Sequence, residues 1–284
     1  MSEDKSFGSF VLICTGLNLL IEGWVHGFLG LINPILLIFL AFMYAAFFFI
    51  LGTLIRRYRL TANQILLFGF LFGLYQEAFN TGSVFDPSPI NLFGINPTML
   101  ILANVFWWGI LQSVMVVNFV HSKLGEIEPL SQNKRTGGWI LSLGFFLFML
   151  FVTIIEENFP PASLEAYSAV IIVLCLGSIL LILSIYKNTK SAKEPLPKQK
   201  EIDNIPGVRE NPFLNKMFKI HLVLSVVMGV IAIFLTEMTL LLFVLWSIVL
   251  GISGLVSIQE KSKGKLLAGL FSVGFLVCFV FSTG

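Results

Sequence analysis

Residues 34–59 read PILLIFLAFMYAAFFFILGTLIRRYR, an apolar run that carries no charge before Arg56 and then ends in three arginines. A helix crosses the hydrocarbon core of a bilayer when about 20 consecutive residues are predominantly apolar. Basic residues accumulate at the cytoplasmic ends of such helices. The stretch therefore predicts a transmembrane helix over 34–56 whose C-terminal end is cytoplasmic.

The composition of the whole chain has the same character. Of its 284 residues, 56% are apolar, 12% are charged and 29 are Phe. Soluble domains carry roughly 25% charged residues, so this chain has too few charges to cover a water-soluble globule. The composition excludes a cytosolic enzyme, a nucleic-acid-binding protein and a disordered chain. It indicates an all-α polytopic membrane protein, with the lipid bilayer as its partner and no nucleic acid.

The span rule divides the chain into nine transmembrane helices arranged as successive hairpins. The predicted spans are 8–29, 34–56, 62–82, 97–120, 137–156, 164–186, 217–236, 239–258 and 265–282. When nine spans alternate across the membrane, all 18 Lys and Arg residues fall on one side. The positive-inside rule then predicts a multi-pass protein of the cell membrane, with its N-terminus cytoplasmic and its C-terminus outside.

The longest polar stretch divides the predicted bundle in two. Residues 187–216 contain four prolines and many lysines, which predicts a cytoplasmic linker between a six-helix bundle over 1–186 and a three-helix bundle over 217–284. The lysines follow the positive-inside pattern. A second interpretation is contact with anionic lipid headgroups, worth about 1 kcal/mol for each lysine near the surface.

Two hairpins of the first bundle share a pattern. Ile-Asn-Pro opens the predicted helices after Asn33 and after Asn96, and in both hairpins a Gly-Leu pair and a Glu precede it. Asn at the N-cap with Pro at the first helical position is a helix-start signal. The pattern indicates either a duplicated hairpin, as in many transporters, or two hairpins with the same cap.

The first span carries the best candidate for a site. Asn18, Glu22 and His26 follow one another at steps of four, which places them on one helix face. Glu22 lies roughly 10 Å inside the span at 1.5 Å per residue. An ionisable group at such depth costs about 2.5–3.5 kcal/mol, so it indicates function or a satisfied hydrogen-bond cluster.

A second group of candidates lies on the third and fourth spans. Gly69, Gly73 and Glu77 share a face, and small residues there favour close approach of a neighbouring helix. The remaining candidates are polar or amphipathic residues deep in apolar segments: Asn80, Asn104, Trp108 and Gln112. Their pattern indicates either a lined pocket or core side chains that bond to neighbouring helices.

Metal and cofactor signals are missing from the sequence. It has 3 Cys and 3 His, without CxxC or HExxH spacing, and it has no phosphate-binding glycine loop. We therefore expect no metal and no cofactor.

Three functions remain open. The first is a transporter or channel-like carrier of a small cationic or neutral solute, with an outward-facing acidic site in the membrane. The second is an intramembrane enzyme that acts on an apolar lipid or isoprenoid, with a buried Glu as general acid. The third is a scaffold or assembly subunit without a ligand. The sequence leaves open whether the protein is an enzyme.

Overall fold

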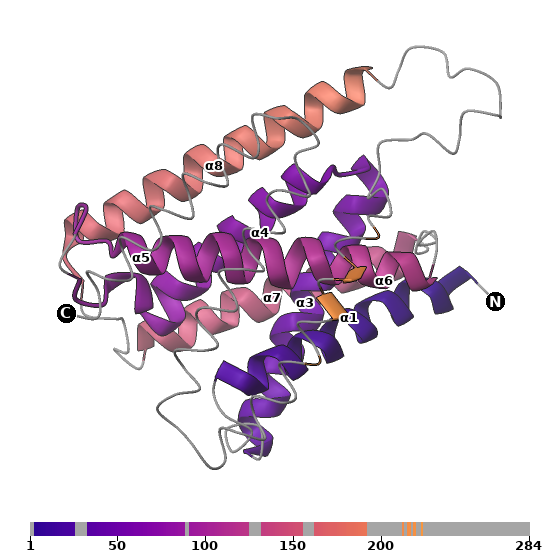
Figure 1. Cartoon of the computed structure of the whole chain (residues 1–284), viewed down its shortest axis with the longest axis horizontal. Helices are drawn as coiled ribbons and strands as arrows, with labels where there is room; N and C mark the ends of the chain where they lie inside the picture. The colour runs from indigo at the N-terminus through magenta and orange to yellow at the C-terminus, as the bar shows by residue number, and fades with distance from the viewer. Residues whose placement is uncertain are drawn as a thin grey trace.

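The computed structural model describes residues 3–25, 33–88, 91–124, 132–155 and 162–191, and six isolated positions between 212 and 223. Within these residues the chain is helical, apart from turns and one isolated bridge between Leu92 and Ile95. Figure 1 shows the long helices lying side by side as one bundle.

The helices begin close to where the sequence predicted the first six spans. In chain order they are α1 (Glu3–Val25), α3 (Pro34–Tyr58), α4 (Ala62–Gln76) with the π-helical turn η1 (Glu77–Thr81), the 3-10 turn η2 (Ser83–Phe85), α5 (Pro97–Met99), η3 (Leu100–Met115), α6 (Val116–Leu124), α7 (Gln132–Ile155) and α8 (Leu164–Ser191). The predicted spans 217–236, 239–258 and 265–282 lie outside the described residues, apart from a few isolated positions. α8 continues to Ser191, past the predicted domain boundary at 186.

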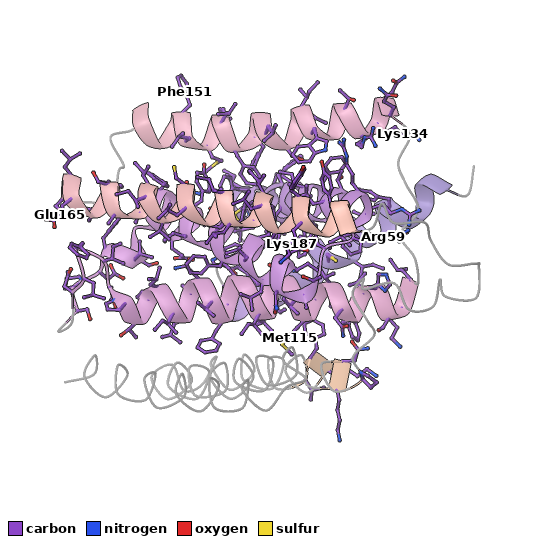
Figure 2. The ribbon with its side chains drawn as sticks, turned by 90° about the horizontal axis from the view of Figure 1, so that it is seen from above. Arg59, Met115, Lys134, Phe151, Glu165 and Lys187 are labelled. Carbon is purple, nitrogen blue, oxygen red and sulfur yellow. The ribbon has the colours of Figure 1, made fainter. Side chains whose placement is uncertain are left out.

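Three of the described helices are long and apolar enough to cross a membrane: Pro34–Tyr58, Pro97–Leu124 and Leu164–Lys187. Within α1, the apolar segment Phe7–Glu22 is shorter. Figure 2 shows Arg59 and Lys134 at one end of the bundle and Glu165 at the other. This arrangement agrees with basic residues collecting at one end, while the total of nine spans and the side each end faces stay predictions.

Asparagine caps fix two of the helix starts, as the sequence predicted. Asn33 Oδ1 accepts hydrogen bonds from the backbone N–H groups of Ile35 and Leu36, at 3.0 and 3.3 Å, ahead of α3. Asn96 Oδ1 accepts in the same way from Thr98 and Met99, at 3.0 and 3.2 Å, ahead of α5. The first N–H groups of a helix lack partners inside it, so each cap satisfies orphan donors.

We expect Asn33→Ala to lower the free energy of unfolding by about 1 kcal/mol, because alanine removes this cap. Asn96→Ala should lower it further, since Asn96 is buried and its amide also donates to the Asp86 carbonyl at 3.3 Å. Thermal unfolding of the purified variants in detergent measures both effects. An Asn96→Ala protein as stable as Asn33→Ala would contradict the expected order.

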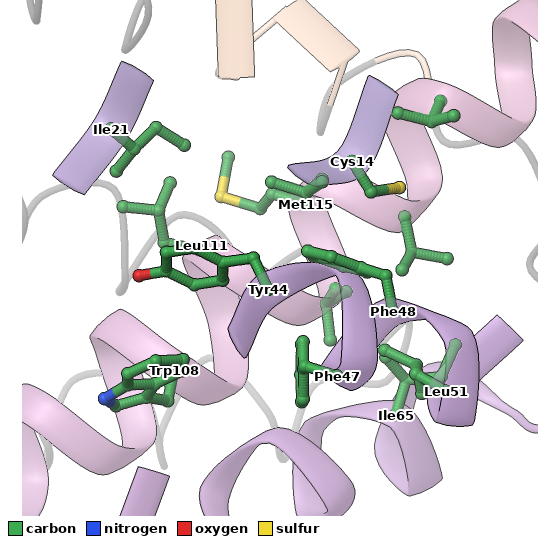
Figure 3. Close-up of a cluster of buried hydrophobic side chains, with 14 of the residues drawn as sticks. Cys14, Ile21, Tyr44, Phe47, Phe48, Leu51, Ile65, Trp108, Leu111 and Met115 are labelled. Carbon is green, nitrogen blue, oxygen red and sulfur yellow. The ribbon is translucent and has the colours of Figure 1, made fainter. Parts of the chain in front are cut away.

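The core forms where α3 packs against its neighbours. Figure 3 shows Tyr44, Phe47, Phe48 and Leu51 of α3 in one cluster of buried side chains with Trp108. α1 packs against α3 and α6, and α4 packs against η3. These contacts bring residues of α1, α3 and η3 to one place in the bundle.

The fourth predicted span differs from the expected α-helix. Residues Leu100–Met115 form a π-helix, with backbone hydrogen bonds from residue i+5 to residue i. The Ser113 hydroxyl also donates to the Trp108 carbonyl at 2.6 Å, five residues back. Gly69 and Gly73 of α4 lie against this wider helix, which confirms the close approach that the small residues predicted.

Candidate functional site

Three helices meet at the Glu22 carboxylate. Tyr44 of α3 donates its hydroxyl hydrogen to Glu22 Oε2 at 2.7 Å. Gln112 of η3 donates from Nε2 to the same oxygen at 3.1 Å, and to the Tyr44 hydroxyl oxygen at 3.0 Å. We call these three residues the inner cluster. It joins residues 90 positions apart in the sequence.

The inner cluster is shielded from the surroundings of the bundle. Glu22 is 7% exposed, and Tyr44 and Gln112 are fully buried. Glu22 is the one acidic or basic residue among the buried residues that the structure describes. Across the described chain, no group bonds to Gln112 Oε1. Burying a polar atom without a partner costs about 1–3 kcal/mol, so this oxygen needs an explanation.

The polar face of α1 extends beyond Glu22. Asn18 is fully buried and donates to the Cys14 carbonyl at 2.9 Å. Within the described part of the chain, Asn18 Oδ1 and the hydroxyl of buried Thr15 lack a hydrogen-bond partner. His26, which the sequence placed on the same face, lies outside the described residues.

A second cluster surrounds Glu77 at the end of α4. Trp108 donates its indole N–H to Glu77 Oε1 at 2.8 Å, and Thr81 donates its hydroxyl to Oε2 at 2.8 Å. Ser83 donates to the same Oε2. We call Glu77, Trp108, Thr81 and Ser83 the outer cluster. Asn80 donates to Gln76 instead, so it lies beside this outer cluster and does not bond to the carboxylate.

The aromatic rings of the two clusters are in contact. The Tyr44 and Trp108 rings lie 5.7 Å apart between their centroids, and Phe47 and Phe72 pack on Trp108 at 6.2 and 5.1 Å. The hydrogen bonds described for Glu22 and for Glu77 nevertheless come from different donors. The sequence placed the candidates on three spans without showing which of them bond to each other, and in the described structure Gln112 bonds to Glu22 while Trp108 bonds to Glu77.

The candidate residues of η3 are Asn104, Trp108 and Gln112, and the last two contribute hydrogen-bond donors to the two clusters. Trp108 bonds to Glu77, and Gln112 bonds to Glu22. Asn104 is fully buried, and neither its Oδ1 nor its Nδ2 has a partner in the described structure. Both clusters include residues of π-helical segments, since Glu77 is the first residue of η1 and both Trp108 and Gln112 lie in η3. Such segments are rare and occur frequently at functional sites.

Sequence reasoning missed three hydroxyl residues of these clusters, Tyr44, Thr81 and Ser83, and the buried hydroxyl of Thr15 on α1. Tyr44 carried a usable signal, because a tyrosine hydroxyl within a charge-free run needs a hydrogen-bond partner when buried. Among the described residues, no three His, Cys, Asp or Glu side chains gather as a metal site. The inner cluster combines a carboxylate, a hydroxyl and an amide, and the outer cluster combines a carboxylate, two hydroxyls and an indole N–H.

We expect Glu77→Gln to lower the pKa of Asp86 in the loop before α5. Partial burial raises the pKa of Asp86 above 3.8, and the charge of Glu77 raises it further. A carboxyl group with a raised pKa binds more protons when folded, so its contribution to stability falls as pH rises through that pKa. The Glu77→Gln variant should therefore narrow the pH range over which Asp86 loses its contribution to stability.

A carboxyl carbon NMR titration of Asp86 measures the change. Glu165→Gln is the matched control, because Glu165 is exposed at the start of α8. An Asp86 midpoint that moves equally in both variants would remove Glu77 as the cause.

The comparisons with known proteins give one match. The model of a family described as "Uncharacterized membrane protein family" matches residues 12–235, well over half of the chain. No curated protein and no solved structure matches the chain. The matched range contains both clusters.

Proposed function

The chain belongs to an uncharacterized membrane protein family, and we propose that it is a multi-pass carrier of the cell membrane that binds a small cationic or neutral solute at Glu22. The proposal includes the nine-span topology with a cytoplasmic N-terminus. It also includes the division into a site-bearing bundle over 1–186, a linker over 187–216 and a second bundle over 217–284.

The buried Glu22 carboxylate carries the proposal. An acidic group inside the bilayer is costly, and such groups commonly mark the pathways of ions and substrates. Three separate helices supply Glu22, Tyr44 and Gln112, so movement of any one helix changes the site. A carrier needs this coupling between binding and helix arrangement, since alternating access moves one group of helices against another.

The scaffold function has one observation in its favour. Glu22 bonds to Tyr44 and Gln112, and Glu77 bonds to Trp108, from one helix to another. Such bonds stabilise helix bundles in membranes. A network kept for packing alone would be expected to satisfy its buried members. Gln112 Oε1 and both polar atoms of Asn104 have no partner in the described part of the chain. These atoms favour a site that receives a ligand.

Flux into proteoliposomes tests the proposal. The probes are radioactive sodium, rubidium and methylammonium for cations, and stopped-flow light scattering with glycerol and urea for neutral solutes. We expect flux of at least one probe above that of protein-free liposomes. Equal rates with and without the protein for all five probes would favour the scaffold.

Tyr44→Phe is the diagnostic variant for the same assay. It removes the hydroxyl that donates to Glu22 and keeps the ring in the aromatic core. We expect flux to fall about tenfold, the value of one hydrogen bond to a charged group. Tyr75→Phe is the control, because the Tyr75 hydroxyl bonds to the Phe146 carbonyl at 3.2 Å, away from Glu22. Equal loss in both variants would remove Glu22 from the proposed site.

A further inference from the structure

We propose that Asn104 of η3 is the polar contact of a second binding site, which takes a small neutral molecule through a hydroxyl or carboxamide group. The site lies at the level of the outer cluster and does not depend on the charge of Glu22. This inference goes beyond the proposed carrier function, because binding at Asn104 is measured separately from flux.

The Asn104 side chain carries the inference. It is fully buried, and neither Oδ1 nor Nδ2 has a hydrogen-bond partner in the part of the chain that the structure describes. Among the described residues with buried unpartnered atoms, Asn104 alone lacks a partner at both ends of its polar group. Buried side-chain amides in proteins almost always have partners, so this amide needs a partner that both donates and accepts.

Other buried amides of the same bundle show what helix packing provides. Gln64 of α4 donates to the Ser184 hydroxyl of α8 at 2.6 Å. Asn118 of α6 donates to the side-chain oxygen of Asn215 at 2.7 Å. Each of these amides obtains a partner from a distant part of the sequence. Asn104 differs from them, although it is as deeply buried.

The packing of α4 on η3 places Asn104 at the level of the outer cluster. The two helices run in opposite directions, with close contacts between Gly69 and Ser113 and between Gly73 and Trp108. A step of four residues is close to one helical turn. Four residues after Gly73 comes Glu77, and four residues before Trp108 comes Asn104. Asn104 and Glu77 therefore face the same level of the bundle.

The depth of Asn104 limits what its partner is. Asn104 lies eight residues after the Asn96 cap, which is at most about 12 Å along the helix at 1.5 Å per residue. The hydrocarbon core of a bilayer is about 30 Å thick, so the proposed topology places Asn104 well inside it. Lipid chains offer no hydrogen bonds at this depth. The partner is therefore a polar molecule bound within the bundle.

The two ends of the amide select the class of ligand. Oδ1 accepts hydrogen bonds, and Nδ2 donates them. A metal cation would pair with Oδ1 and leave the N–H groups without a partner, whereas an anion would pair with the N–H groups and leave Oδ1. A hydroxyl or a carboxamide both donates and accepts, so one such group satisfies both ends of Asn104.

Fluorine NMR of the full chain in detergent tests the inference. The chain is labelled with 5-fluorotryptophan, and the spectrum of Trp108→Phe identifies the Trp108 signal among the five tryptophans. Trp108 is the reporter because it lies one step of four from Asn104 along η3. The probes are acetamide and glycerol. Acetone is the control ligand, since it has the shape of acetamide and accepts hydrogen bonds without donating them.

We expect acetamide or glycerol to shift the Trp108 signal in a saturable way. Acetone should bind about tenfold more weakly than the better probe, because it leaves the donor of its pair with Asn104 Oδ1 missing. A Trp108 signal that saturates with neither probe would overturn the inference. Equal affinities for acetone and the better probe would overturn it as well, since recognition would then not involve both ends of the amide.

Asn104→Leu separates a ligand site from an internal hydrogen bond. Leucine has nearly the shape of asparagine and removes both polar atoms. The saturable shift should disappear, while the melting temperature without probe should stay the same or rise, because no partner within the bundle is lost. Asn118→Leu is the matched control, and it should melt at a lower temperature because Asn215 loses its donor. An equal fall in both variants would show that Asn104 is bonded within the bundle and would end the proposal.

The failure of this inference and the failure of the carrier function are distinguishable. Solute flux without saturable binding at Asn104 would remove the second site and leave the proposed function standing. Saturable binding that Asn104→Leu abolishes, in a protein without flux for any probe, would remove the carrier function and leave this site standing.

Discussion

Glu22→Gln is expected to reduce solute flux by about 100-fold or more while the protein keeps its fold. Glutamine has nearly the same size as glutamate, and its amide oxygen can still accept hydrogen bonds from Tyr44 and Gln112. The substitution removes the negative charge that the proposed solute or ion requires. Loss of one partner from a buried, hydrogen-bonded charge pair costs about 2–5 kcal/mol. A cost in this range corresponds to a loss of flux of about 100-fold or more.

The measurement is the initial rate of uptake into proteoliposomes, with size-exclusion chromatography to confirm folding. Glu165→Gln is the matched control, because it makes the same chemical change at an exposed position of α8. Glu77→Gln adds a second comparison, since Glu77 belongs to the outer cluster. Wild-type flux in Glu22→Gln would show that the solute does not depend on this carboxylate.

Gly69→Ala is expected to lower the free energy of unfolding by about 1–3 kcal/mol, the usual range for an overpacked core. A Cβ atom at Gly69 would lie 2.2 Å from Ser113 Oγ and 2.6 Å from the Trp108 carbonyl oxygen. The carbonyl belongs to the backbone of η3, so α4 and η3 must move apart. Alanine gains about 1 kcal/mol over glycine in helix propensity, and the expected clash exceeds that gain.

Gly144→Ala is the matched control for this prediction. Gly144 lies in α7, and a Cβ atom there would have nothing within 4 Å. That variant should be as stable as the wild-type protein or more stable, because only helix propensity changes. Thermal unfolding of both variants in the same detergent gives the comparison. A Gly69→Ala protein as stable as Gly144→Ala would show that α4 and η3 do not pack as closely as the structure indicates.

Gly73→Ala adds a functional consequence to the same packing argument. Its Cβ atom would lie 2.6 Å from three side-chain atoms of Trp108. The indole must then move, which affects its 2.8 Å hydrogen bond to Glu77. The packing of α4 on η3 thus sets the geometry of the outer cluster.

The helices of the described chain could be predicted from the sequence because their causes are local. The apolar run after Pro34 is long enough to span a bilayer by itself. The caps at Asn33 and Asn96 involve only the next three residues. The π-helix over Leu100–Met115 was not predictable in this way, because it accompanies close packing against Gly69 and Gly73 of another helix.

The candidate site was predictable in part. A polar residue deep within an apolar helix is visible in the sequence, and this signal found Glu22, Glu77, Trp108 and Gln112. It did not show which of them bond to each other. The stripe of η3 divides between two carboxylates, and Tyr44 became a member of the inner cluster only through its contact with Glu22.

The sequence by itself determined that this is a helical membrane protein and where its described helices lie, since apolar length and capping act between neighbouring residues. The tertiary structure alone decided that Glu22 bonds to Tyr44 and Gln112 while Glu77 bonds to Trp108. Those partners come from helices whose rotation and depth depend on how small residues and aromatic rings pack. Hydrogen bonds form only within about 3 Å, so the membership of each cluster follows from that packing.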